Sequence, residues 1–394
     1  MAQPATPPFL SGSWSYPTTI RFGAGRIAEL PDACKTLGMA RPLLVTDPGL
    51  SGLPMVASAL RRNEDAALPT GLFSEVRGNP VGANVEAGVA AYRTGGHDGV
   101  IAFGGGSAMD AAKGIALMVG QDRPIWDFED IGDNWTRANA EAIAPIVAVP
   151  TTAGTGSEVG RAGVIVNEAT HTKVIVFHPR LLPGQVILDP ELTIGLPPHV
   201  TAATGMDALA HNLEAFCAPT FHPMGEGIAV EGMRLVKEYL PRAVVDGTDI
   251  EARGHMLAAA SMGTVAFQKG LGAIHSLSHP LGAVYDTHHG LTNAVVMPYV
   301  LDFNRPAIEE KCARLARWLD LPEAGFDGLR RWVLDLRAEL GIPHTLAEIG
   351  VDDARIDEIA RMATADPSAG TNPVPLDDAG HRAMLEAALV GRLA

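Results

Sequence analysis

The sequence has 394 residues, which is enough for two domains at about 100 to 200 residues per domain. Hydrophobic residues make up 47% of the chain and charged residues 19%, so a large buried core is expected and global disorder is not. The formal net charge of −15 argues against a nucleic-acid partner or an anionic membrane surface, because both require a basic face.

Cysteine usage and the N-terminus bear on the cellular compartment. Cys34, Cys217 and Cys312 are isolated and form no CxxC pair, which favours a reducing cytosol and excludes a cysteine zinc knuckle. The stretch 1–17 has neither a basic region nor an uninterrupted apolar run of the kind found in signal peptides. No apolar run approaches the roughly 18 to 20 residues of a membrane helix. The sequence therefore predicts a cytoplasmic protein.

The first half alternates short apolar runs with helical patterns, which indicates βαβ units around a parallel sheet. The predicted strands are 18–23, 42–46, 71–76, 98–103 and 143–149, and a hairpin is predicted at 163–167 and 173–177. The helical patterns between them are 26–37, 54–62, 85–94 and 108–119. We therefore expect an α/β domain.

Asp47 closes the predicted strand 42–46, a position from which its carboxylate can accept the hydroxyl groups of an adenosine ribose. Such a role favours NAD over NADP. The alternative is a turn or cap aspartate, because Pro48 and Gly49 follow, and position alone favours this alternative. In the usual Rossmann fingerprint the acidic residue follows the glycine loop, whereas here it precedes the glycines, so the domain is a different dinucleotide fold or none.

A glycine run, Gly104, Gly105, Gly106 and Ser107, follows the strand 98–103 and opens the next helix. This arrangement is typical of a phosphate site, because glycines permit close backbone approach and the unpaired N–H groups of the helix start face the anion. The run is not GxGxxG, so a bare turn is the alternative. The flanking strand and helix favour the phosphate site.

A polar loop, 150–158, follows the strand 143–149 and carries hydroxyl and N–H donors where open α/β sheets bind ligands. A capped polar loop explains its composition but not its position at a strand end. Lys173, in the second hairpin strand, is placed to reach a ribose or a phosphate, although an isolated lysine is usually just solvated.

The composition changes near residue 195. Downstream, long helical patterns replace the β-branched runs, for example at 198–216, 224–239, 251–267 and 307–319. We divide the chain into an α/β domain at 1–195 and a helical domain at 196–394.

The helical half contains two groups of metal-ligand residues. Asp207 and His211 are four positions apart, as are His275 and His279, so each pair lies on one face of a helix. His289 follows after a glycine-containing break. Taken singly, each histidine could be a core residue with its hydrogen bonds satisfied, and the aspartate could be a helix cap or a surface residue.

Three imidazoles and a carboxylate suit Zn²⁺ or Fe²⁺ and are too nitrogen-rich for Ca²⁺ or Mg²⁺. A catalytic site keeps one position open, so five candidates imply that one histidine has another task.

These motifs, in this order, resemble those of the iron-containing (group III, metal-dependent) alcohol dehydrogenases over nearly the whole chain. The matching stretches are 19–25, Asp47, 104–113, 150–158, 205–211 and 275–290. The resemblance implies a dehydroquinate synthase-like architecture, with an α/β N-terminal dinucleotide-binding domain and an all-α C-terminal metal-binding domain.

The resemblance also implies a role for each matching residue. It gives the metal to Asp207, His211, His275 and His289. It leaves His279 off the metal, as a catalytic proton-relay or positioning group. It gives the ribose to Asp47 and the pyrophosphate to Gly104, Gly105, Gly106 and Ser107. It gives the rest of the cofactor site to Asn79, Thr151, Thr152, Thr155 and Lys173. One departure is His288, where many members have proline; the spacings from His275 and His279 fit His289 as the ligand.

The function implied by the resemblance is hydride transfer between NAD(H) and a small alcohol/aldehyde or ketone pair, with the substrate oxygen bound to Fe²⁺ or Zn²⁺. NADP is less favoured because of Asp47. A homodimer or larger homo-oligomer is expected.

An alternative within the fold is a maleylacetate reductase or a dehydroquinate synthase-like lyase. Maleylacetate reductases usually lack this ligand set, and we find no lysine and arginine cluster for a phosphorylated sugar acid. A further alternative is a non-catalytic protein that binds a nucleotide and a structural metal.

Overall fold

The computed structural model describes residue 16 and residues 18–393, so nearly all of the 1–17 segment lies outside the described residues. The chain divides into two compact units. One contains Pro17–Thr201 and Arg242–Ser261, and the other is formed mainly by Ala202–Pro241 and Met262–Ala394. Within the described part of the chain, no helix is long and apolar enough to cross a membrane. The domain boundary at residue 195 remains a prediction.

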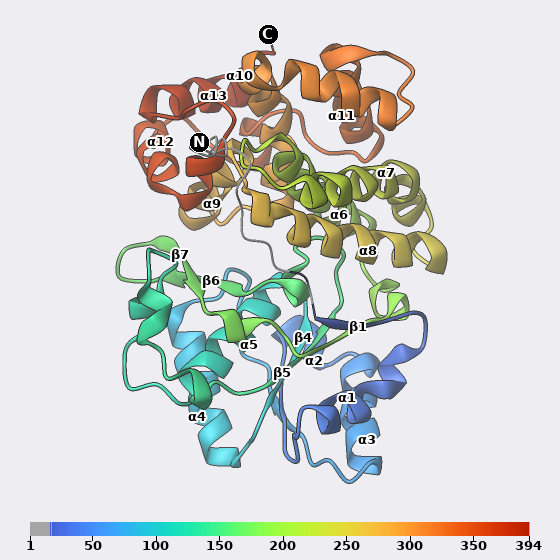
Figure 1. Ribbon diagram of the computed structural model, residues 1–394, viewed down its shortest axis with the longest axis vertical. Coiled ribbons are helices and arrows are strands. Elements are labelled where there is room, and N and C mark those ends of the chain that lie inside the picture. The colour runs from blue at the N-terminus through green and yellow to red at the C-terminus, as the bar shows by residue number, and fades with distance from the viewer. Residues whose placement is uncertain (1–15, 17, 394) are drawn as a thin grey trace, which may run out of the picture. The chain divides into compact units, whose positions relative to one another are not determined.

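A sheet of six parallel strands forms the centre of the first unit, in the order β1-β8-β5-β4-β2-β3 (Figure 1). The strands are β1 (Thr19–Phe22), β2 (Leu43–Val45), β3 (Gly71–Phe73), β4 (Val100–Gly104), β5 (Ile146–Pro150) and β8 (Gln185–Leu188). A separate antiparallel hairpin joins β6 (Ala162–Asn167) to β7 (Thr172–Phe177). The predicted α/β fold is confirmed.

The sequence prediction omits β8, which pairs with both β1 and β5. Its residues, Gln185–Leu188, are all buried, so the strand has no alternation of polar and apolar residues to mark it. A run of four residues between Gly184 and Asp189 is too short for periodicity to identify.

Helices cover both faces of the sheet. On one face α1 (Leu30–Thr36) and α3 (Pro54–Asp65) pack on inward residues of the central strands, including Ile101 and Phe103 of β4. The other face of β4, with Val100 and Ala102, is buried as well and contacts α5 (Gly106–Met118). Helix α4 (Gly82–Gly95) packs on α5, and Figure 1 shows α4 on the opposite side of the sheet from α1 and α3.

The second unit is helical throughout its described residues, as expected for the C-terminal half. Its helices include α6 (Pro198–Cys217), α9 (Ala273–Tyr285), α10 (His289–Trp318), α11 (Gly325–Glu339), α12 (Ile356–Ala365) and α13 (Asp378–Val390). Helices α7 (Pro223–Val245) and α8 (Ile250–Ala266) contribute residues to both units, as does α6, whose first residues, 198–201, belong to the first unit.

Helix α10 is much longer than the predicted segment 307–319, because two prolines interrupt its sequence pattern. Pro298 has no N–H, so the carbonyl of Ala294 loses its helical donor. The buried guanidinium of Arg337, from α11, donates to Ala294 O at 3.2 Å and to Val295 O at 2.8 Å. A side chain from a neighbouring helix thus satisfies the carbonyl that the proline leaves without a partner.

Candidate active site

Three helices of the second unit contribute the predicted metal ligands. Asp207 and His211 lie on α6, His275 lies on α9, and His289 is the first residue of α10. Gly290 permits α10 to begin against α6, because a Cβ at this position would lie 2.3 Å from the carbonyl oxygen of Ala203. The glycine therefore brings His289 next to Asp207.

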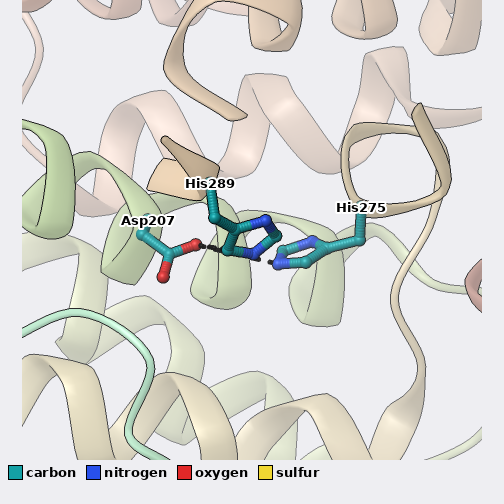
Figure 2. A group of neighbouring side chains, drawn as sticks. All are labelled: Asp207, His275 and His289. Carbon is teal, nitrogen blue, oxygen red and sulfur yellow. Dashed lines mark ion pairs between the residues drawn. The ribbon is translucent and has the colours of Figure 1, made fainter. Parts of the chain in front are cut away.

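Asp207, His275 and His289 form a compact cluster (Figure 2). Their ligand atoms all lie within 4.8 Å of one another. Oδ1 of Asp207 lies 3.8 Å from Nε2 of His275 and 3.6 Å from Nε2 of His289. Asp207 and His275 are buried, with 2% and 1% of their surface exposed, and His289 is half-buried. Figure 2 shows the three side chains pointing toward one another.

The other ring nitrogens of these two histidines have partners of their own. Nδ1 of His275 lies 2.6 Å from Oε2 of Glu214, a buried carboxylate on α6. Nδ1 of His289 lies 3.3 Å from the hydroxyl of Ser278, which donates to the carbonyl of His275. Because these contacts use Nδ1, both imidazoles present Nε2 to Asp207.

Asn293, one turn after His289, lies at the centre of the cluster. Its Nδ2 donates to Oδ1 of Asp207 at 2.7 Å and lies 3.3 Å and 3.2 Å from Nε2 of His275 and His289. Its Oδ1 is buried and has no hydrogen-bond partner among the described residues. The amide thus contacts the same three atoms that a bound metal would contact.

His211 lies beside the cluster but outside the group of three. Its ring stacks on His275, with centroids 4.5 Å apart, and also contacts Phe267. Its Nδ1 lies 4.0 Å from Oδ1 of Asp207. Its role as a fourth ligand therefore remains a prediction.

His279 is held by a carboxylate from a distant part of the chain. Its Nδ1 lies 2.8 Å from Oδ2 of Asp366, and its ring stacks on His289 with centroids 5.5 Å apart. The other oxygen of Asp366 accepts a hydrogen bond from the backbone N–H of Ser368. The pair resembles the histidine and carboxylate arrangements that orient an imidazole for proton transfer.

The buried carboxylates decide the electrostatics around the imidazoles. Burial lowers the pKa of His275, but the hydrogen bond and charge of Glu214, with further help from Asp207, outweigh burial and leave the pKa raised. Burial raises the pKa of Asp366, but the charge and hydrogen bond of His279 outweigh it and leave that pKa lowered. The pKa of His275 and the pKa of Asp366 are therefore shifted toward the charged forms of these two groups despite their burial.

His288 is separate from the cluster, although it precedes His289 directly. It is exposed and forms the N-cap of α10, where its Nδ1 accepts from the backbone N–H of Leu291 at 3.4 Å. His288 thus caps the helix, whereas the next residue, His289, belongs to the cluster.

In the first unit, the predicted phosphate loop lies at the carboxyl end of β4. Gly104 has φ 148°, a conformation that L side chains rarely adopt, and Gly105 is the N-cap of α5. Gly105 has no side chain with which to cap this helix, so the backbone N–H groups of its first turn receive no cap from the N-cap residue. The loop therefore has the backbone geometry that a pyrophosphate requires.

The other polar segments meet this loop. The register pairs Gly104 with Pro150, and Thr151 N donates to Gly104 O at 2.9 Å. Thr152 and Thr155 lie against the loop, 3.3 Å and 2.5 Å from where Cβ atoms on Gly105 and Gly106 would lie. The two predicted cofactor segments are therefore neighbours.

Asp47 has the capping role that was its alternative interpretation. It is the N-cap of α2 (Pro48–Ser51), and its Oδ1 accepts from Leu50 N at 3.0 Å. Its Oδ2 points to the glycine loop, 3.6 Å from where a Cβ on Gly104 would lie. The cap and a ribose contact are compatible, because they use different oxygens.

A buried lysine on α5 anchors the threonine loop. Lys113 is 1% exposed, and its Nζ donates to the carbonyl and hydroxyl of Ser157 and to the carbonyl of Ala162. Burial lowers its pKa to about 8, although Asp110 and Glu158 oppose that shift. The loop position thus depends on a charged group in the core.

The remaining predicted cofactor residues lie on the flanks of this region. Asn79 precedes α4 and has a left-handed backbone, with φ 54°. Lys173 lies on β7. Burial raises the pKa of the Asp110 carboxyl, and the charges of Lys113 and, more weakly, Lys173 oppose that shift. The contacts of Asn79 and Lys173 with a cofactor remain predictions.

Four residues that support the cluster are not predicted from the sequence: Glu214, Ser278, Asn293 and Asp366. For Glu214 a signal existed, because its spacings from Asp207 and His211 place all three on one face of α6. Asn293 likewise lies four positions after His289. Asp366 has no such signal, because it lies 87 positions from His279.

Comparison with known proteins agrees with this geometry. Residues 17–190 match the family described as iron-containing alcohol dehydrogenase, and residues 201–389 match its C-terminal family. A 4-hydroxybutyrate dehydrogenase from Cupriavidus necator is 42% identical over 94% of this chain and 98% of that protein. An NAD-dependent methanol dehydrogenase from Bacillus methanolicus is 35% identical over 89% of this chain and 93% of that protein. The crystal structure of a 1,3-propanediol oxidoreductase superposes with a TM-score of 0.91 at 34% identity, covering 96% of this chain and 100% of that chain. The chain therefore belongs to the iron-containing alcohol dehydrogenase family and is an NAD-dependent alcohol dehydrogenase with a candidate metal site at Asp207, His275 and His289.

Proposed function

We propose that the chain transfers a hydride between NAD(H) and a short aliphatic alcohol/aldehyde pair, and that Asp207, His211, His275 and His289 hold the divalent metal. The observation that carries the proposal is the convergence of a carboxylate and two imidazoles, from three helices, within 4.8 Å.

These residues fit the divalent metal that the family implies. One carboxylate and several neutral imidazoles form a donor set suited to Fe²⁺ or Zn²⁺. The amide of Asn293 supports this fit, because its Nδ2 contacts all three converging ligand atoms. When bound, the ion supplies Lewis acidity that lowers the pKa of a substrate hydroxyl, and NAD⁺ supplies the hydride acceptor.

In the proposal, His279 accepts the proton of the substrate hydroxyl at Nε2. Its Nδ1 already donates to Asp366, so Nε2 is the nitrogen with a free lone pair. The buried carboxylate also stabilises the imidazolium that forms.

The proposed cofactor site combines the start of α5 with Asp47 and the threonine loop. The N–H groups after Gly105 bind the pyrophosphate, which suits a chain with a net charge of −15. Oδ2 of Asp47 accepts from the ribose hydroxyls and repels a 2′-phosphate, which makes NAD the preferred cofactor over NADP.

The first substrate to test is 4-hydroxybutyrate, because a relative at 42% identity is named for it. Methanol and 1,3-propanediol follow from the other relatives. The proposal includes a homo-oligomer of two or more chains and a cytoplasmic location.

The test is NADH formation from this panel of alcohols by enzyme stripped with a chelator and reloaded with Fe²⁺ or Zn²⁺. We expect no turnover in the stripped enzyme and recovery with at least one metal and one alcohol. Activity confined to maleylacetate, or full activity without metal, would contradict the proposal.

A further inference from the structure

Glu214 has two separate contacts at the start of α9. It lies on α6, on the same face as Asp207 and His211, and only 6% of its surface is exposed. Its Oε1 accepts from the backbone N–H of Ile274 at 2.7 Å, and its Oε2 lies 2.6 Å from Nδ1 of His275.

The start of α9 leaves room for the carboxylate of Glu214. The N-cap of α9 is Gly272, which has no side chain to cap the helix. A Cβ there would lie 2.7 Å from Oδ1 of Asn372 and 3.1 Å from Oε1 of Glu214. Asn372 caps the neighbouring N–H, of Ala273, at 3.0 Å. Two side chains from elsewhere thus cap α9, and only Glu214 also touches the imidazole.

The second contact decides which nitrogen of His275 carries the proton. A carboxylate is only an acceptor, so His275 must donate from Nδ1. In the neutral imidazole Nε2 then carries the lone pair, and this atom lies 3.3 Å from Nδ2 of Asn293 and 3.8 Å from Oδ1 of Asp207. A neutral imidazole binds a metal only through its unprotonated nitrogen.

We infer that Glu214 is a positioning residue that fixes His275 in the Nδ1–H tautomer and thereby makes Nε2 a metal ligand. The inference rests on the proposed metal site. The competing explanation is that Glu214 serves only to cap α9. The two explanations differ in what a glutamine at this position does.

In Glu214→Gln the side chain keeps its shape but loses one acceptor. If the amide oxygen caps Ile274, the NH₂ group faces Nδ1 of His275 and favours the tautomer with the proton on Nε2. The opposite orientation is disfavoured, because the NH₂ group would face the N–H of Ile274, a backbone donor that cannot give up its proton, whereas the imidazole can move its proton to Nε2. Either orientation breaks one of the two contacts. Asn372→Ala is the matched control, because it removes a cap of the same helix without touching the imidazole.

The experiment measures Zn²⁺ affinity of the metal-free full-length chain by competition with a chromophoric chelator, together with the melting temperature. We expect Glu214→Gln to weaken Zn²⁺ binding about 10- to 100-fold. Asn372→Ala should lower the melting temperature and leave Zn²⁺ affinity within about threefold of wild type. Wild-type affinity in Glu214→Gln would overturn the inference, whereas a wild-type chain that binds no metal would overturn the proposed function itself.

A second measurement needs no variant at Glu214. Nitrogen-15 NMR of the Zn²⁺-loaded wild type, with the His275 signals assigned by their loss in His275→Gln, reports which ring nitrogen is protonated. The inference predicts a proton on Nδ1 and metal on Nε2, and the opposite pattern would overturn it even if Glu214→Gln failed to fold.

Discussion

Each imidazole of the active site outside α6 is held through its Nδ1 nitrogen, by two carboxylates and one hydroxyl. Spacing alone identified the histidines, because i, i+4 pairs are visible in any sequence. Their partners depend on tertiary contacts, as with Asp366, which lies 87 positions from His279. At the scale of residues, the sequence therefore predicts which side chains can bind a metal, and the structure adds what orients them.

His279 is expected to handle a proton and not to bind the metal. His279→Ala should therefore lower kcat by about 10²- to 10⁴-fold, which is typical for loss of a general acid or base. Asp366→Asn should lower kcat in the same direction but less, because the imidazole remains. Metal content, measured by elemental analysis, should equal that of wild type in both variants. Loss of the metal in His279→Ala would make this histidine a ligand instead.

Asp47 is expected to select the cofactor with the oxygen that does not cap α2. Asp47→Ser retains a capping oxygen and removes the charge that repels a 2′-phosphate. The ratio of kcat/KM for NADP⁺ to that for NAD⁺ should rise by about tenfold, equivalent to about 1.4 kcal/mol. Steady-state kinetics with both cofactors measure this ratio. An unchanged ratio, or a wild type that prefers NADP⁺, would contradict the assignment.

At the scale of elements, the sequence pattern located most strands of the sheet and the hairpin β6–β7. The β4–α5 unit was predictable because a buried strand, glycines and a helical pattern follow one another directly. Strand β8 was not, because its four buried residues show no alternation. The full length of α10 was hidden by Pro298 and Pro306. At Pro298 the lost hydrogen bond is replaced by a donor distant in sequence, the guanidinium of Arg337.

The threonine loop is expected to depend on Lys113 of α5. Lys113→Met removes the donor to Ser157 and Ala162 and leaves the carboxylates of Asp110 and Glu158 without their cation. Unfolding free energy should fall by about 3 to 5 kcal/mol, the usual cost of breaking a buried charge pair, and KM for NAD⁺ should rise. Urea unfolding and steady-state kinetics measure these changes. The exposed Lys35→Met is the control and should change neither quantity appreciably.

The same variant has a pH signature. The pKa of Lys113 is about 8 in the folded chain against 10.5 for an ordinary lysine. Between these values the unfolded chain holds the proton and the folded chain does not, so this residue makes the unfolding free energy rise with pH. The difference in unfolding free energy between wild type and Lys113→Met should therefore widen from pH 8 to pH 10. If the difference in unfolding free energy stayed constant from pH 8 to pH 10, the pKa of Lys113 would not be lowered in the folded chain.

At the scale of the whole molecule, the division into an α/β part and a helical part was readable from composition, because β-branched runs give way to long helical patterns. The contributions of α7 and α8 to both compact units were not readable, because helical periodicity does not say what a helix packs against. The metal site also depends on how helices pack, because its ligands come from three of them, α6, α9 and α10.

The central claim is that this chain binds a catalytic divalent metal through Asp207, His275 and His289. Elemental analysis of anaerobically purified wild type, His275→Ala and His288→Ala, with turnover measured on the same samples, tests it most directly. His288 is the control, because it is an exposed imidazole that caps α10 next to the cluster. We predict about one divalent ion per chain and full turnover in wild type and His288→Ala, and neither in His275→Ala. Full turnover of metal-free His275→Ala would contradict the claim.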